Sequence, residues 1–182
     1  MTNVLVTIET ELGDIVAEIF VDKAPITARN FLAYVDRGLY TNGHWYRTVE
    51  PDNQPDNDIR IEVIQGGINP ELVGQRLDPI PLERTTVTSL SHTDGTLSMS
   101  RFSPDSAHSE IFICIGDQPD LDFGGMRNPD GQGFGAFGRV TSGMDVVKAI
   151  QRSPHEKQTL TPAIVIRAIT RAHRAIAPLA SA

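Results

Sequence analysis

Three side chains from separate parts of the sequence could together hold a peptide. Arg47 follows an aromatic pair, Gln65 precedes two glycines, and Phe112 lies in an apolar run. A guanidinium supplies donors in a planar fork, and a carboxamide supplies both donors and acceptors. An aromatic ring adds apolar surface. This combination suits binding a peptide backbone beside an apolar ring, and it is unlike the site of a hydrolase or a metalloprotein.

Each of these residues also has a structural interpretation that the sequence leaves open. Arg47 could be a strand arginine paired with an acid, because such pairs are common at protein surfaces. Gln65 could cap a strand that the following glycines end. Phe112 reads as a core residue in any case, and a core position is compatible with the wall of a pocket. Met99 is of a type that often fills gaps in a core.

Alternating apolar residues predict many short strands and two helices. The strand patterns cover residues 4–10, 15–20, 61–65, 85–90, 95–100, 111–116, 136–140 and 163–170. One helix is expected from Pro25, which suits a first helical turn, to a stop at Gly38. A second is expected from Met144 to about Arg152, with Ser142 as its cap. These elements favour a mostly-β fold, a closed antiparallel barrel plugged at both ends.

The length of 182 residues fits one domain. There is no internal repeat and no linker, so we expect the barrel domain to cover residues 1–171. Residues 172–182 have no periodic pattern and are expected to form a flexible tail. Residues 50–58 are acidic and interrupted by proline, which predicts a polar loop.

The charge and composition argue against several classes of partner. The formal net charge is −7, whereas nucleic-acid binding draws much of its affinity from a basic surface. The negative net charge also disfavours binding to the surface of anionic membranes. No apolar run approaches the ~18 residues that a membrane span needs. The first residues lack a secretory signal pattern, so we expect a cytoplasmic protein. Nothing resembles a coiled coil or a large exposed apolar stripe, so we expect a monomer.

Several motif matches lack the context that their chemistry needs. Residues 133–138 read G-x-G-x-x-G but continue into a strand, whereas a dinucleotide fingerprint opens a helix. The 50–58 loop lacks the glycine and glutamate register of a calcium loop. The histidines and the single Cys114 show no zinc-ligand spacing, and Ser106 and His108 lack a nucleophile-elbow context. We therefore expect no metal, nucleotide or other cofactor.

A series of motifs, from about residue 4 to residue 170, gives a more specific indication. They include Ala24-Pro25-Ile26-Thr27 and Gln65-Gly66-Gly67, and they cover residues 12–14, 20, 24–31, 40, 46–47, 65–67, 95–99, 109–113, 137–140 and 143–147. In this order the sequence resembles the cyclophilins, which are peptidyl-prolyl cis-trans isomerases. The resemblance implies a closed eight-stranded antiparallel barrel capped by two α-helices. It also implies a protein that isomerises X–Pro bonds of polypeptides and needs no cofactor.

The resemblance also implies roles for individual residues. Arg47 matches the guanidinium that donates to the proline nitrogen as the amide twists. Gln65 matches the carboxamide that orients this guanidinium and contacts the substrate backbone, and Phe112 matches one wall of the proline pocket. The remaining substrate-binding positions implied by the family are Tyr46, Glu62, Val63, Met99, Ser100, Arg101, Glu110, Leu121 and Phe134.

Two of these positions carry acids where the family has neutral residues. Glu62 stands at the place of a pocket-floor phenylalanine, where a carboxylate would bear a desolvation cost. Ile61 or Val63 could fill that space instead. Glu110 stands at the place of a glutamine, and it could pair with Arg47 and divert the guanidinium from substrate.

Three further positions depart from the family pattern. Asp120 replaces a tryptophan that matters for cyclosporin binding in the family, so weak or no inhibition by cyclosporin is expected. Phe134 replaces a histidine and keeps an aromatic surface, and Arg101 replaces an asparagine of the backbone-binding segment. Because the groove would be acidic, peptides with Lys or Arg near the proline should be preferred, with a preference that shrinks as salt rises.

Two other classes of function stay open at this point. The chain could be a cyclophilin-like module that binds proline-containing or basic segments with little catalysis, which the acids at positions 62, 110 and 120 would favour. It could also be an unrelated barrel that binds a small ligand inside. The apolar inward positions of the strands speak against the second alternative, because small barrels are filled by their own side chains.

Overall fold

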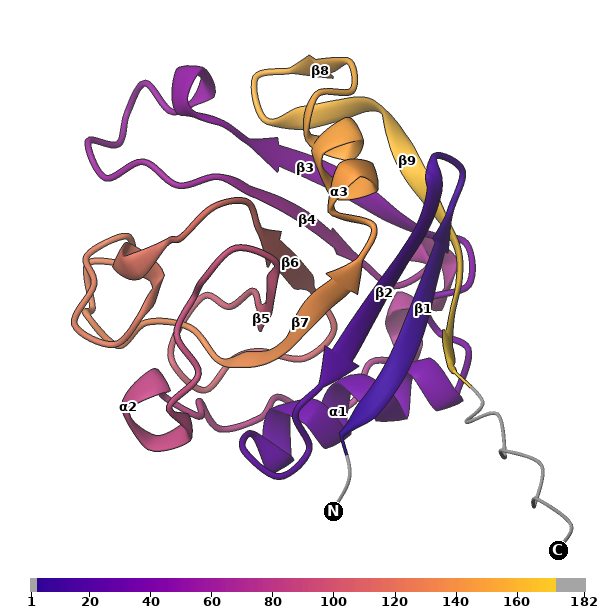
Figure 1. The fold of residues 1–182 in the computed structure, drawn as a ribbon, viewed down its shortest axis with the longest axis horizontal. Helices are drawn as coiled ribbons and strands as arrows, with labels where there is room; N and C mark the ends of the chain where they lie inside the picture. Colours follow the sequence, from indigo (N-terminus) through magenta and orange to yellow (C-terminus); the bar gives the residue numbers. More distant parts are fainter. Residues whose placement is uncertain (1–2, 173–182) are drawn as a thin grey trace, which may run out of the picture.

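The computed structural model describes residues 3–172 and contains the expected closed barrel (Figure 1). The elements are β1 (Val4–Thr10), β2 (Gly13–Ile19), α1 (Pro25–Asp36), β3 (Gly43–Val49), β4 (Val63–Gly67), α2 (Thr85–Thr88), β5 (Thr96–Met99), β6 (Ile111–Cys114), β7 (Ala136–Ser142), α3 (Met144–Gln151), β8 (His155–Glu156) and β9 (Thr159–Arg171). Short 3₁₀ helices cover Pro51–Asn53, Pro70–Gln75 and Pro119–Leu121.

Eight strands form the ring in the order β1-β2-β7-β5-β6-β4-β3-β9, and the pairing of β1 with β9 closes it. Every pairing is antiparallel, and β8 pairs only with β9. The predicted eight-stranded antiparallel barrel is therefore confirmed. Within residues 3–172, no helix is long and apolar enough to cross a bilayer. Residues 173–182, nearly all of the expected tail, lie outside the described residues.

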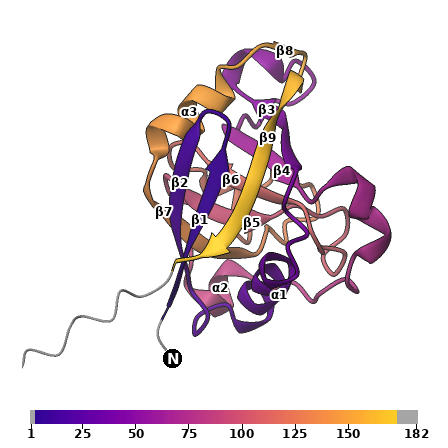
Figure 2. The same cartoon turned by 90° about the vertical axis from the view of Figure 1, so that its right-hand side faces the viewer.

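The two longer helices, α1 and α3, lie at opposite ends of the barrel (Figures 1 and 2). Pro25 is the first residue of α1, as expected, and the helix buries Phe31, Tyr34 and Val35. The ring of Phe31 packs 5.0 Å from that of Phe137 on β7, measured between centroids. At the other end, α3 buries Val147 and Ile150. Each helix thus closes one end by turning its apolar face inward.

Two local expectations are wrong. Residues 85–90 do not form a strand, because Thr85–Thr88 make one turn of helix that ends at Ser89 in the left-handed conformation (φ 58°). The ring has no vacant edge for this segment, since β5 already pairs with β6 and β7. Ser142 is not the cap of α3; it is the last residue of β7, and Gly143 is the N-cap with φ 96°. A side chain at Gly143 would also meet the backbone of Asp14, so the turn requires glycine.

The buried apolar residues form two separate clusters, which matters for the site. The residues of strand β6 contribute alternately to the two clusters, because successive side chains of a strand point to opposite faces of the sheet. Ile111 and Ile113 belong to the main core inside the barrel. Phe112 and Cys114 belong to a second cluster on the outer face. We call this second group the outer cluster; it consists of Val49, Ile61, Val63, Phe112, Cys114 and Leu121, with Phe134 packed against it.

Candidate active site on the outer face of the barrel

A β-bulge in β3 gives Arg47 its direction. Trp45 pairs with Gly66 of β4, and Arg47 pairs with the next residue along, Gln65, so that Tyr46 is the extra residue between them. Two residues apart, Trp45 and Arg47 would share a face in a regular strand. The bulge reverses the alternation. Trp45 therefore lies in the barrel core, fully buried, whereas Arg47 lies on the same outer face as Gln65.

Two carboxamides hold the Arg47 guanidinium in place. Its Nη1 donates to Oε1 of Gln65 at 2.8 Å, and its Nε donates to Oε1 of Gln158 at 2.9 Å. Burial lowers the pKa of Arg47, but an arginine stays protonated at neutral pH. Among the residues that the structure describes, Nη2 has no hydrogen-bond partner. The cation is thus oriented by neutral groups and keeps a donor for a further acceptor.

A chain of hydrogen bonds continues from Gln65 to Glu110. Nε2 of Gln65 donates to the hydroxyl of Tyr46 at 3.0 Å, and this hydroxyl donates to Oε2 of Glu110 at 2.7 Å. The other carboxylate oxygen of Glu110 accepts from Arg76 at 3.0 Å and from Ser109 at 2.9 Å. Burial, followed by the charge of Glu110, raises the pKa of Tyr46, so the phenol stays a donor. Glu110 is therefore engaged by these groups and does not pair with Arg47.

A cavity of about 130 Å³ lies beside Arg47 and Gln65. Its apolar wall comes from the outer cluster and Phe134, and its polar wall carries three guanidinium groups. The lining consists of Arg47, Ile61, Val63, Gln65, Ser100, Arg101, Phe112, Leu121, Arg127 and Phe134. This volume is well below the ~300–1,000 Å³ of pockets for drug-sized ligands. The cavity suits one small apolar group next to a hydrogen-bond donor.

Phe112 is fixed between two rings. The ring of His92 stacks on it at 6.0 Å between centroids, and the ring of Phe134 meets it edge-on at 5.6 Å. His92 is itself held at both ring nitrogens, with Nδ1 2.7 Å from Oδ1 of Asp122 and Nε2 2.9 Å from Oγ of Ser98. A partly buried polar network thus holds His92 against the side of the Phe112 ring.

The carboxylate of Asp122 should make the stability of this wall depend on pH. Burial raises the pKa of Asp122, but the hydrogen bonds from His92 outweigh burial, and the pKa lies below its ordinary value of 3.8. Stabilisation by such a group is present above the unfolded-state pKa and is lost as the pH falls through the folded-state pKa. We therefore expect Asp122→Asn to reduce the free energy of unfolding by about 1 kcal/mol at pH 7.

Urea denaturation of both proteins at pH 7 and at about pH 2.5 checks this expectation. The difference in unfolding free energy between wild type and Asp122→Asn should shrink at the lower pH, because the carboxyl is then mostly protonated in the unfolded state, whose ordinary pKa is 3.8. An equal difference at both pH values would show that the charge of Asp122 contributes nothing to stability.

Arg101 is committed to the structure around the cavity. Its Nε and Nη2 donate to the carbonyl of Gly133 at 2.9 and 2.6 Å, and its guanidinium forms a bidentate pair with Asp130. The guanidinium carbon also lies 4.8 Å from the centroid of the Phe134 ring. Arg101 therefore fixes the position of Phe134 and is neutralised by Asp130.

The structure brings most of the residues implied by the sequence to one place. Those that line the cavity are Arg47, Val63, Gln65, Ser100, Arg101, Phe112, Leu121 and Phe134. Tyr46 and Glu110 lie next to them in the hydrogen-bond chain. Glu62 does not line the cavity, because its carboxylate accepts from Nε2 of Gln151 at 3.1 Å. Ile61 and Val63 take up the apolar wall instead.

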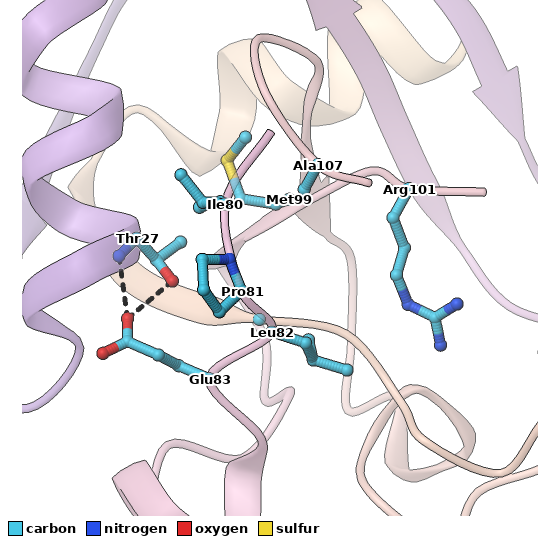
Figure 3. Close-up of a pocket in the computed structure, with 9 residues that line it drawn as sticks. Thr27, Ile80, Pro81, Leu82, Glu83, Met99, Arg101 and Ala107 are labelled. Atoms are coloured by element: carbon cyan, nitrogen blue, oxygen red, sulfur yellow. Dashed lines mark hydrogen bonds between the residues drawn. The ribbon is translucent and has the colours of Figure 1, made fainter. Parts of the chain in front are cut away.

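Met99 lines a different and much smaller hollow, of about 10 Å³ (Figure 3). Pro81 and Ala107 lie beside Met99, and the guanidinium of Arg101 points away from Met99. Glu83 caps helix α1 there, since its carboxylate accepts from the backbone N–H and the hydroxyl of Thr27, both at 2.7 Å. The hollow has room for about one water molecule, so these contacts are structural.

Two functional candidates escape the sequence analysis. Gln158, in the turn between β8 and β9, holds Nε of Arg47. Arg127, in the loop before β7, contributes to the cavity lining. Both lie in loops without a periodic pattern, so no sequence signal marks them. Within residues 3–172, no group of three or more His, Cys, Asp or Glu side chains is placed to hold a metal ion.

Comparison with known proteins agrees with this fold and identifies a family. Residues 5–171 match the family model described as cyclophilin type peptidyl-prolyl cis-trans isomerase/CLD. A peptidyl-prolyl cis-trans isomerase of Acinetobacter baylyi is 36% identical over 155 residues, which cover 85% of this chain and 75% of that protein. Peptidyl-prolyl cis-trans isomerase B of Escherichia coli is 36% identical over 148 residues, which cover 81% of this chain and 84% of that protein.

Solved structures show the same fold. The crystal structure of a Cryptosporidium parvum cyclophilin-type peptidyl-prolyl cis-trans isomerase superposes with a TM-score of 0.71 at 22% identity, covering 94% of this chain and 98% of that chain. The family match, the two bacterial relatives and the fold agree with one another. The chain belongs to the cyclophilin-type peptidyl-prolyl cis-trans isomerase family.

Proposed function

We propose that this protein catalyses cis–trans isomerisation of X–Pro bonds in polypeptides and that Arg47 stabilises the twisted amide. Amide resonance opposes rotation about a peptide C–N bond with a barrier of ~18–20 kcal/mol. For X–Pro bonds the two isomers are close in energy, and uncatalysed exchange takes tens to hundreds of seconds. A catalyst must favour the twisted state, in which the proline nitrogen is pyramidal and has recovered its lone pair.

The observation that carries this proposal is the uncommitted Nη2 of a guanidinium held beside an apolar cavity. Arg47 is fixed by the carboxamides of Gln65 and Gln158, and Phe112 forms part of the apolar wall next to it. A proline ring in the cavity would lie within reach of this donor. The planar amide offers its nitrogen little as an acceptor, whereas the twisted amide offers a lone pair. A donor aimed at that nitrogen binds the transition state better than the substrate, which is the condition for catalysis.

The alternative of a binding module with little catalysis has less support in the geometry. It depends on the acids at positions 62, 110 and 120 making the groove acidic. None of these three residues lines the cavity, and Glu110 is held by Tyr46, Arg76 and Ser109. Arg47 therefore keeps its donor for substrate.

Cis–trans exchange of an Ala-Pro-Phe peptide, followed by NMR exchange spectroscopy, tests the proposal. We expect catalytic amounts of the folded protein to accelerate exchange well above the uncatalysed rate of the peptide. Unchanged exchange in the presence of folded protein would overturn the proposed activity. Peptide binding without acceleration would instead support the binding module.

Inhibition by cyclosporin should be weak or absent. Asp120 stands where the resemblance implies a tryptophan that matters for cyclosporin binding. Replacing an indole by a carboxylate removes apolar contact and adds a desolvation cost for an apolar ligand. The same peptide exchange assay, run with increasing cyclosporin, measures this, and complete inhibition at stoichiometric cyclosporin would contradict it.

A further inference from the structure

Arg127 places a second uncompensated cation in the wall of the cavity. Its Nη1 donates to Oε1 of Gln54 at 2.7 Å and to the carbonyl of Ile59 at 2.6 Å. Both acceptors are neutral. No ion pair joins Arg127 to a carboxylate within residues 3–172, and no hydrogen bond there uses its Nε or Nη2. The side chain is therefore fixed at one nitrogen and keeps its charge and its other donors for a ligand.

The lining of the cavity has an unbalanced charge. It contains three guanidinium groups and no carboxylate, in a protein whose formal net charge is −7. Asp130 neutralises Arg101 through a bidentate pair. Arg47 and Arg127 are both held by neutral groups. Both guanidinium groups line one cavity, so the two cations repel each other across the site. In agreement with this, burial lowers the pKa of Arg127 and the nearby charge of Arg47 lowers it further.

This arrangement argues against the preference for basic peptides that the sequence suggests. An acidic groove would favour Lys or Arg next to the proline, but the acids at positions 62, 110 and 120 do not line the cavity. Arg127 also lines a second, wider groove, which contains charges of both signs, including Glu50, Asp52, Asp56 and Lys157. The local excess of positive charge is thus confined to the cavity itself. It would act on the substrate residue that lies beside the proline ring.

We propose that Arg127 is a specificity-determining residue that selects substrates with a carboxylate on the residue next to the proline. This inference rests on the proposed isomerase function. A carboxylate placed between Arg47 and Arg127 would relieve their repulsion, and its oxygens could accept from the unused donors of Arg127. Charge-assisted hydrogen bonds of this kind are stronger than neutral ones. Arg127 does not act on the twisting amide, so its effect is on substrate choice.

The test compares peptides that differ only by Glu or Gln on either side of the proline, in the form Ala-Xaa-Pro-Phe and Ala-Ala-Pro-Xaa. At about 20 mM ionic strength, where screening is weak, we expect kcat/KM for Glu to exceed that for Gln about three- to tenfold at one of the two positions. The ratio should fall towards one in about 0.5 M salt.

Variants of the protein assign the preference to Arg127. Arg127→Gln should abolish the Glu preference, so that kcat/KM becomes equal for the Glu and Gln peptides, and Arg127→Lys should retain much of the preference because the charge remains. Arg139, an exposed arginine on β7, provides a control, and Arg139→Gln should leave the ratio unchanged. A Glu-to-Gln ratio of one or less at both positions in wild type, or a ratio that survives Arg127→Gln, would overturn the inference.

A neutral Ala-Ala-Pro-Phe peptide separates this inference from the proposed function. If wild type does not accelerate exchange of the neutral peptide, the isomerase proposal fails. The dissociation constants of the Glu and Gln peptides, from NMR titration, then decide the inference on their own. Tighter binding of a Glu peptide that depends on Arg127 would support it, and equal, weaker or undetectable binding of the Glu peptides would overturn it.

Discussion

Arg47→Ala should reduce kcat/KM for isomerisation of a proline peptide by about 10²–10³-fold, the range found when a single transition-state donor is removed. Stability should change little. The substitution removes two hydrogen bonds to carboxamides, but it also removes a partly desolvated cation that has no carboxylate partner within residues 3–172. A net change of about 1 kcal/mol corresponds to a shift in Tm of roughly 2–4 °C for a chain of this size.

Two further variants make the interpretation specific. Arg47→Lys keeps the positive charge but loses the planar fork that bonds Gln65 and Gln158 together, so it should recover only a small part of the activity. Arg139→Ala removes an exposed strand arginine and should leave both activity and Tm unchanged. Peptide exchange by NMR and thermal unfolding measure the two properties. Near wild-type rates in a folded Arg47→Ala protein would exclude a role for this guanidinium in the reaction.

Phe112→Ala should impair both stability and activity. Phe112 is 5% exposed and packs in the outer cluster, and removing a buried phenyl ring usually costs 3–5 kcal/mol. We expect a loss of about 3 kcal/mol, hence a decrease in Tm of roughly 6–12 °C. The protein should stay folded because the core inside the barrel is a separate cluster. Loss of the wall against which a proline ring would pack should lower kcat/KM about 30-fold.

The matched control for this variant is Phe123→Ala. Phe123 lies in the loop before β7 and is 44% exposed, so its removal should change stability by no more than about 0.5 kcal/mol. Thermal unfolding and the peptide exchange assay measure both variants. If Phe112→Ala lowers Tm but leaves kcat/KM intact at a temperature where it is folded, Phe112 is a core residue only.

The sequence predicted those parts of the fold that depend on local patterns. The first hairpin and the start of α1 at Pro25 follow from alternation and from proline at a first helical turn. The segment at residues 85–90 contains β-branched threonines, which favour strands, yet it forms a helical turn because all neighbouring edges are paired. Local preference failed there because tertiary pairing decides which strand-forming segments join the sheet.

The candidate site was predictable only where a motif marks it. Arg47, Gln65 and Phe112 belong to short motifs, and the structure places all three on one cavity. The bulge at Tyr46 was not predictable, since it depends on the pairing of β3 with strands distant in the sequence. Arg127 and Gln158 also lie outside the motifs, and only the path of their loops brings Arg127 to the cavity and Gln158 to the guanidinium of Arg47. The charge of the site therefore could not be read from the acids nearest in sequence.

The division of the apolar residues into two clusters has a consequence for how such a protein can change over generations. Substitutions in the outer cluster and its covering loop alter the pocket, while the strands, the two end helices and the core inside the barrel keep their own contacts. New pocket residues can therefore arise without disturbing the contacts of the core inside the barrel. The strands and the inner core can thus stay the same while residues on the outer face change, and new substrate preferences can be selected there.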